Sequence, residues 1–318
     1  MGEQHHAYDS FEEFLQTAAV NLEILLPEMF DQEPCDFYLN PRYLRGSDFL
    51  MRWSQGRWAE DIVVRAINAT GEFRAVPYGP SSVAPSDPQE MEQYFERLDR
   101  AGATGKRPDL LILSRREYQK IRRQLDTLGL DNIPFTPEES LRFLLSTALI
   151  AVEVETSLWV AKQMPDYGKG KPLTRQGRPD LIGFAKDKKV PTVIIKDEDL
   201  EPLQQWETRW RVPIFVFHVF YDQAYYISLQ RVRWLISEGI INRTRQTFYA
   251  PGGPTTSKWI YKIWYTLAHP LGTVTRPPEM VAKFVQDKNG HILPYVHFSG
   301  GEMTLSKEIL GELRSRLR

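Results

Sequence analysis

The chain of 318 residues contains 40 basic and 41 acidic side chains, so its formal net charge is −1. This length allows one large or two modest domains with a buried core. The balanced charge and 42% hydrophobic content exclude a uniformly basic coat protein and an acidic disordered chain. A single cysteine, Cys35, excludes a disulfide framework and a cysteine-based zinc site. With no apolar run of membrane-spanning length and an acidic N-terminus, we expect a cytoplasmic protein.

The neutral total conceals an uneven charge distribution. Residues 1–50 carry ten acidic and two basic side chains, whereas basic residues dominate 100–123, 166–196 and 231–265. The last of these ranges also contains several Trp and Tyr residues. Basic residues mixed with aromatic ones are typical of surfaces that follow a phosphate backbone, although single stretches of this kind are often solvated faces over core aromatics. Three such stretches favour a nucleic-acid partner.

Hydrophobic periodicity predicts an alternation of helices and strands along the chain. A helix is expected over 10–30 and another over 48–68, in which Gln55 and Gly56 allow a break. Later helices are expected over 115–128, from Thr136 onward, and over 158–164, 199–211 and 307–317; strands are expected over 110–113, 149–155, 193–196, 214–220 and 224–228. The alternation predicts an α/β (α+β) fold, in which helices flank a mixed central β-sheet.

Carboxylates near two of the predicted strands indicate a metal site. Asp109 follows a proline at the entry to an apolar strand, and Glu153 and Glu155 lie two residues apart on another. Residues two apart on a strand share a face, and neighbouring carboxylates in an apolar strand are costly without a positive charge between them. Oxygen ligands favour Mg²⁺ over zinc. With Lys196 at the end of a further apolar strand, the set predicts a phosphodiester hydrolysis site.

Alternatives to this interpretation remain open. Glu153 and Glu155 could form ion pairs with a basic helix, and Lys196 could begin a solvated turn that caps the next helix. A second Pro-Asp pair ends at Asp180, sixteen residues before Lys196. The residue two positions before that lysine is Ile194, so this pair lacks an acidic residue beside the lysine. We therefore rank Asp109 ahead of Asp180 as the motif aspartate.

These motifs resemble a known nuclease superfamily. Arg-Pro-Asp-Leu at 107–110 is followed, 44 residues after Asp109, by Glu-Val-Glu-Thr-Ser from Glu153. The pair resembles the PD-(D/E)xK nucleases, except that Glu155 replaces the usual lysine. Gln-Gly-Arg-Trp-Ala-Glu at 55–60 resembles the helical glutamate element of these enzymes, and the segment from Lys196 to Tyr221 resembles type II restriction endonucleases of the AccI-like group.

The resemblance implies an architecture and a set of site residues. It implies an N-terminal helical segment over 1–50, a restriction-endonuclease-like core over 51–230 and a C-terminal mixed β/α specificity region over 231–318, which can also pack with the core as one domain. Asp109, Glu153 and Glu155 would bind Mg²⁺, with Lys196 or another residue as the replacement amine and Glu60 as an accessory carboxylate. The residues expected to contact DNA are Lys106, Arg107, Ser81, Ser82, Arg243, Arg245, Gln246, Lys258 and Lys262.

The resulting prediction is a Mg²⁺-dependent type II restriction endonuclease that hydrolyses double-stranded DNA. By analogy, we expect a homodimer, because palindromic sites match two-fold symmetry, and a cognate DNA methyltransferase in the same system. A structure-selective repair or junction nuclease and a catalytically inactive DNA-binding module on the same fold are the alternatives. Nucleotide-binding glycine loops, the Gly-x-Ser-x-Gly elbow and His-Glu-x-x-His are absent from the sequence.

Overall fold

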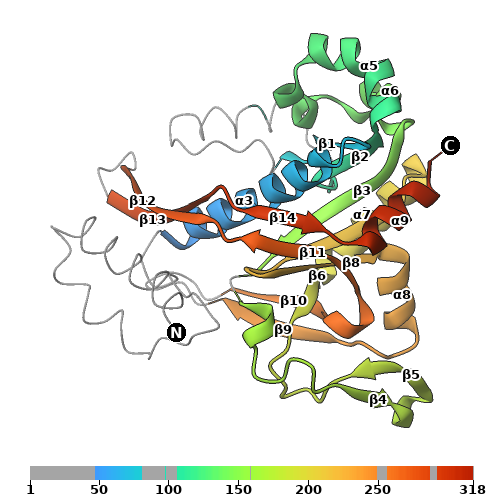
Figure 1. Ribbon diagram of the computed structural model, residues 1–318, viewed down its shortest axis with the longest axis vertical. Helices are drawn as coiled ribbons and strands as arrows, with labels where there is room; N and C mark the ends of the chain where they lie inside the picture. Colours follow the sequence, from blue (N-terminus) through green and yellow to red (C-terminus); the bar gives the residue numbers. More distant parts are fainter. Residues whose placement is uncertain are drawn as a thin grey trace.

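The computed structural model describes residues 47–80, 97, 106–157, 159–248, 256–286 and 292–317. The predicted helix over 10–30 and the predicted DNA contacts Ser81 and Ser82 lie outside the described residues. Figure 1 shows the arrangement of the helices and strands.

The centre of the molecule is a mixed sheet of seven strands, in the order β1-β2-β3-β7-β8-β11-β14. β3 and β7 are parallel, and all the other neighbours are antiparallel. The strands are β1 Phe73–Pro77, β2 Leu110–Ser114, β3 Ala148–Thr156, β7 Ile214–Val219, β8 Gln223–Ser228, β11 His269–Arg276 and β14 Glu302–Leu305. The predicted α/β fold with a mixed central sheet is confirmed.

Helices cover both faces of this sheet. Buried side chains of α3 and α9 belong to one core cluster, and those of α5, α6, α7 and α8 to the other. The bounds are α3 Ser47–Ala69, α5 Arg115–Leu128, α6 Arg142–Leu145, α7 Asp197–Trp210, α8 Leu229–Ser237 and α9 Lys307–Ser315. Short 3-10 turns lie at Leu130–Phe135, Glu138–Leu141, Ala161–Gln163, Thr174–Gln176 and Tyr265–Leu267. No described helix is long and apolar enough to cross a membrane.

The described residues also form three smaller sheets. One has the order β6-β10-β9, and two are antiparallel pairs, β12 with β13 and β4 with β5. Their bounds are β6 Thr192–Lys196, β10 Thr256–Trp264, β9 Arg243–Phe248, β12 Glu279–Gln286, β13 Ile292–Ser299, β4 Lys171–Leu173 and β5 Arg178–Gly183. The region after residue 230 thus supplies β11 and β14 to the central sheet and pairs β10 with β6, so it packs against the core rather than apart from it.

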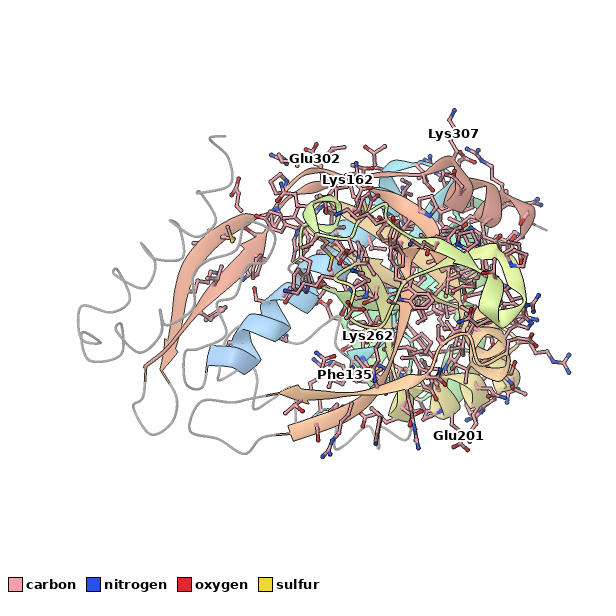
Figure 2. All side chains as sticks on the ribbon, turned by 90° about the horizontal axis from the view of Figure 1, so that it is seen from below. Phe135, Lys162, Glu201, Lys262, Glu302 and Lys307 are labelled. Atoms are coloured by element: carbon pink, nitrogen blue, oxygen red, sulfur yellow. The ribbon has the colours of Figure 1, made fainter. Side chains whose placement is uncertain are left out.

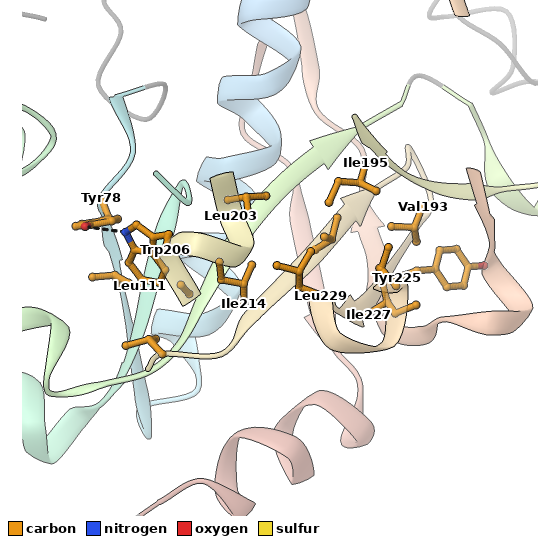
Figure 3. Close-up of a cluster of buried hydrophobic side chains, with 14 of the residues drawn as sticks. Tyr78, Leu111, Val193, Ile195, Leu203, Trp206, Ile214, Tyr225, Ile227 and Leu229 are labelled. Carbon is orange, nitrogen blue, oxygen red and sulfur yellow. Dashed lines mark hydrogen bonds between the residues drawn. The ribbon is translucent and has the colours of Figure 1, made fainter. Parts of the chain in front are cut away.

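The core on the α7 side of the sheet contains a buried polar network. Trp206 of α7 packs edge-on against Tyr78, and its indole Nε1 donates a hydrogen bond to the Tyr78 hydroxyl at 3.3 Å (Figure 3). The same Nε1 donates to Glu138 Oε1 at 2.7 Å. Leu111 of β2 and Leu203 of α7 lie in the same cluster. A buried indole needs an acceptor, so the network fixes α7 relative to the loop that follows β1.

Three predicted helices differ from those observed. The helix predicted over 158–164 is wrong: in the described part of this range only a 3-10 turn forms. Val160 is extended, and the Trp159 carbonyl accepts the Tyr221 amide at 3.1 Å, so the chain pairs with the segment after β7 instead of starting a helix. The helix predicted from Thr136 is reduced to a 3-10 turn and the four-residue α6. The break allowed near Gln55 and Gly56 does not occur, since α3 runs through both residues.

The uninterrupted α3 leads to a stability prediction. A Cβ at Gly56 would meet no atom within 4 Å, so Gly56→Ala adds no clash and removes backbone freedom from the unfolded chain. We expect the free energy of unfolding to rise by about 0.5–1 kcal/mol, measured by urea denaturation. A decrease would mean that the helix needs a bend at this position.

Candidate active site

The pairing of β2 with β3 places Asp109 beside Glu153. Leu110 is opposite Val152 in this antiparallel register. Asp109, which precedes Leu110, therefore lies next to Glu153, which follows Val152. The Asp109 amide donates to the Val152 carbonyl at 2.8 Å, and the Val154 amide donates to Asp109 Oδ2 at 2.7 Å. The carboxyl group of Asp109 is therefore held at a defined position on the edge of β3.

The segment after β1 supports Asp109 from the other side. The amides of Tyr78 and Gly79 both donate to the Asp109 carbonyl, at 2.8 and 2.9 Å. A Cβ at Gly79 would lie 2.8 Å from the Pro108 carbonyl oxygen and 2.9 Å from Asp109 Cα. Only glycine allows this approach, so residue 79 contributes to the position of the aspartate.

The alternation of β3 directs its two glutamates toward α7 and β6. Ile150 and Val152 pack in the core on the α3 side of the sheet, and Ala151 packs in the core on the other side. Glu153 and Glu155 share the phase of Ala151, so they project to that second face. Glu153 is 3% exposed and Glu155 is partly buried, as expected for carboxylates that serve a site rather than a solvated surface.

A buried histidine aligns β6 over the central sheet. His218 of β7 lies opposite Glu155 in the parallel register, and its Nδ1 accepts a hydrogen bond from the Ile194 amide at 3.3 Å. Burial lowers the pKa of His218 to about 3, so the ring is a neutral acceptor. β6 ends two residues later at Lys196, whose Nζ lies 3.6 Å from Glu155 Oε1 and 3.6 Å from Asp199 Oδ2.

Asp199, which the sequence analysis does not identify, completes a trio of carboxylates with Glu153 and Glu155. Ligand atoms of Glu153, Glu155 and Asp199 lie within 4.8 Å of one another. Glu153 Oε2 is buried and has no hydrogen-bond partner among the described residues, so it offers a lone pair to a cation. A hard divalent cation with oxygen ligands, such as Mg²⁺, fits this donor set. The available signal was the spacing of Lys196 and Asp199, which meet at i, i+3 as the chain enters α7.

Lys106 lies among these carboxylates. Its Nζ forms an ion pair with Glu153 Oε1, and its side chain is mostly buried. We predicted Lys106 as a DNA contact, but its position three residues before Asp109 brings the ammonium group into the cluster. Lys106 is therefore a second amine at the site, together with Lys196.

The charges of this cluster are mutually dependent. Burial first, and then the negative charge of Asp109, raise the pKa of Glu153 well above its usual range, against the opposing effect of Lys106. Burial also raises the pKa of Glu155, although Lys196 opposes it. Burial alone would lower the pKa of Lys106, but Glu153, Asp109 and Asp199 raise it. The pKa of Lys196 is raised, chiefly by Glu155. Both amines thus stay protonated.

Other predicted site residues are placed apart from this cluster. Asp180 is exposed on β5 and has the charged neighbour Arg231. The aspartate that lies beside Glu153 is Asp109. Glu60 is buried on α3, which packs on the opposite face of the sheet from Glu153 and Glu155. Its accessory role stays a prediction. Arg107 donates to the carbonyls of Pro134 and Thr136 and pairs with Glu138, so its partly buried side chain is bound to the protein itself.

The remaining predicted DNA contacts lie together on β9 and β10, which we call the β9–β10 ribbon (residues 243–248 and 256–264). Arg243, Arg245 and Gln246 lie on β9, and Lys258 and Lys262 lie on β10. Figure 2 shows side chains projecting from these strands, with Lys262 labelled. Because β10 pairs with β6 and Ile260 lies opposite Lys196, the ribbon adjoins the carboxylate cluster.

Comparison with known families decides the assignment of the chain. The model of the AccI restriction endonuclease family matches residues 8–169. The chain belongs to the AccI restriction endonuclease family. Searches of curated proteins and of solved structures give no match.

Membership of the AccI restriction endonuclease family implies a DNA nuclease. It confirms the predicted resemblance to type II restriction endonucleases. The matched range includes Glu60, Asp109, Glu153 and Glu155, but Lys196 and Asp199 lie beyond it.

The raised pKa values of the two glutamates generate a prediction about cation binding. Because Glu153 and Glu155 hold protons to higher pH than ordinary glutamates, protons compete with a cation there, and the competition weakens as pH rises. We expect Mg²⁺ to raise the melting temperature at about pH 8 and much less at about pH 5. At ten times the dissociation constant the stabilisation is about 1.4 kcal/mol.

Matched variants distinguish this site from general ion effects. Asp199→Asn should abolish the Mg²⁺-dependent shift, whereas Glu117→Gln, at an exposed ion pair with Lys120 on α5, should keep it. Equal shifts at both pH values, or an unchanged shift in Asp199→Asn, would contradict the assignment.

Proposed function

We propose that the protein is a Mg²⁺-dependent type II restriction endonuclease that hydrolyses double-stranded DNA at a specific sequence. The main support for this proposal is the cluster of four carboxylates with two lysines in a chain of the AccI family. The cluster contains Asp109, Glu153, Glu155, Asp199, Lys106 and Lys196. Clustered carboxylates and amines at the end of a buried strand have the composition needed for phosphodiester hydrolysis.

In this proposal the carboxylates hold the metal. Asp109, Glu153 and Glu155 are the ligands expected from sequence, and the proximity of Asp199 supports its addition. Mg²⁺ supplies positive charge against phosphate oxygens and lowers the pKa of a coordinated water. The hydrogen bond from the Val154 amide orients Asp109, and the rigid pleat of β3 keeps the two glutamates aligned.

The lysines have separate positions and therefore separate roles. Lys106 pairs with Glu153, the more buried glutamate, and would stabilise negative charge on the scissile phosphate. Lys196 pairs with Glu155 and Asp199, so it would orient those carboxylates and favour the ionised form of Glu155 as ligand or base. Glu60 is retained as an accessory carboxylate.

DNA recognition is assigned to the basic surface next to the cluster. Arg243, Arg245 and Gln246 carry donors and acceptors suited to guanine and adenine edges. Lys258 and Lys262 would contact phosphates, as would Arg243 on DNA that lacks a matching base edge. A homodimer would present two sites to a palindromic sequence. A cognate DNA methyltransferase and a cytoplasmic location follow by analogy with restriction systems.

Plasmid cleavage tests the function and the choice of aspartate. With Mg²⁺, we expect plasmid or phage DNA to yield discrete bands. Asp109→Asn should reduce cleavage by at least about a hundredfold, because it removes charge from the cluster, while Asp180→Asn should cleave like the wild type. Cleavage retained in Asp109→Asn would overturn the assignment. A smear would instead favour a structure-selective nuclease. If the DNA is not cut, the result would favour an inactive DNA-binding module.

A second comparison separates the two lysines. Lys106→Met should lower kcat by about a hundredfold to a thousandfold with little change in DNA affinity, the loss typical of a removed transition-state donor. Lys196→Met should cost less, because this lysine is more exposed and its field is more screened. Lys120→Met on α5 is the matched surface control. A larger loss in Lys196→Met would reverse the two roles.

A further inference from the structure

The first turn of α7 connects the carboxylate cluster to the β9–β10 ribbon. Three consecutive acidic residues, Asp197, Glu198 and Asp199, begin α7 directly after β6, and we call them the acidic turn. Asp199 belongs to the carboxylate trio. Asp197 and Glu198 pair instead with cations of the ribbon, so the turn has one carboxylate in the site and two outside it.

The two outward carboxylates neutralise residues expected to bind DNA. Arg243 Nη1 lies 3.4 Å from Asp197 Oδ2, and Lys258 Nζ lies 2.6 Å from Glu198 Oε1. One pair joins the turn to β9 and the other to β10. In the free protein, each of these cations is therefore occupied by a carboxylate rather than available to a phosphate.

These ion pairs are open to exchange. The side chains of Lys258 and Glu198 are 43% and 57% exposed, and ion pairs at such exposed positions contribute little net stability. Asp197 keeps a second partner, because the Tyr261 side chain also hydrogen-bonds to it. A phosphate could thus replace either carboxylate without leaving a buried charge unpaired.

The ribbon also presents an exposed aromatic platform. Trp259 is 46% exposed, and the Arg243 guanidinium lies over its ring, 4.9 Å from the centroid. A cation stacked on an indole keeps its orientation when its anionic partner changes. Arg243 can therefore exchange Asp197 for a phosphate while it remains on Trp259.

We propose that Asp197 and Glu198 are specificity-determining residues that compete with DNA phosphates for Arg243 and Lys258. DNA that offers only phosphates must displace these carboxylates, so it binds weakly. DNA that also supplies matching base edges gains further contacts and overcomes the competition. The inference rests on the proposed function and adds to it a reason why arbitrary sequences are rejected.

The test measures binding to a labelled duplex of arbitrary sequence by fluorescence anisotropy in EDTA, over a series of salt concentrations. Glu198→Gln should tighten binding by about threefold to tenfold. The slope of log K against log salt should also become steeper, by the amount expected for about one additional phosphate contact. Glu201→Gln is the matched control: it makes the same charge change on α7, but Glu201 is exposed, hydrogen-bonds with Gln205 and forms no ion pair in the described residues (Figure 2).

A double-mutant cycle assigns the gain to Lys258. In a Lys258→Gln background, Glu198→Gln should tighten binding far less than in the wild type. The plasmid digest by Glu198→Gln should also contain additional bands. Equal tightening by Glu198→Gln and Glu201→Gln, or an equal gain in the Lys258→Gln background, would overturn the inference while leaving the endonuclease proposal intact. A wild-type protein that neither binds duplex DNA at low salt nor cleaves it would overturn both.

Discussion

The antiparallel pairing of β2 with β3 is the constraint on which the candidate site depends. It sets Asp109 next to Glu153, and the Val154 amide holds the aspartate there through Oδ2. Both strands are buried, so a slip of one residue would turn their apolar side chains and the glutamates to the wrong faces. The hydrophobic core thus enforces a geometry that, by itself, brings carboxylates unfavourably close.

The cost of that geometry is offset by residues from other elements. Lys106, from the segment before β2, pairs with Glu153, and Lys196, from the end of β6, pairs with Glu155. His218 keeps β6 in place through the Ile194 amide. The two lysines offset part of the repulsion among the carboxylates, and Glu153 Oε2 has no hydrogen-bond partner among the described residues, so it can accept a cation.

Local patterns predicted the strands well and the partners of the site less well. Apolar runs gave β2, β3 and β6, and period-two alternation put Glu153 and Glu155 on one face. Asp199 is not predicted as a site residue and Lys106 is predicted only as a DNA contact, because their proximity to Glu153 comes from tertiary packing between segments far apart in the chain. The helix predicted over 158–164 is absent for a related reason, since the Trp159 carbonyl pairs with the amide of the distant Tyr221.

The parallel pairing of β3 with β7 has a consequence for the order of assembly. Parallel strands need a crossover, and the crossover from β3 to β7 contains both β6 and the start of α7. A nascent chain that has just completed β3 therefore possesses its two glutamates but not Lys196 or Asp199. The carboxylate cluster is complete only after the chain beyond β6 has been made, because His218 of β7 binds the Ile194 amide and β10 pairs with β6. During synthesis, the glutamates of β3 therefore exist before the lysine of β6 and the aspartate of α7 that lie beside them in the folded protein.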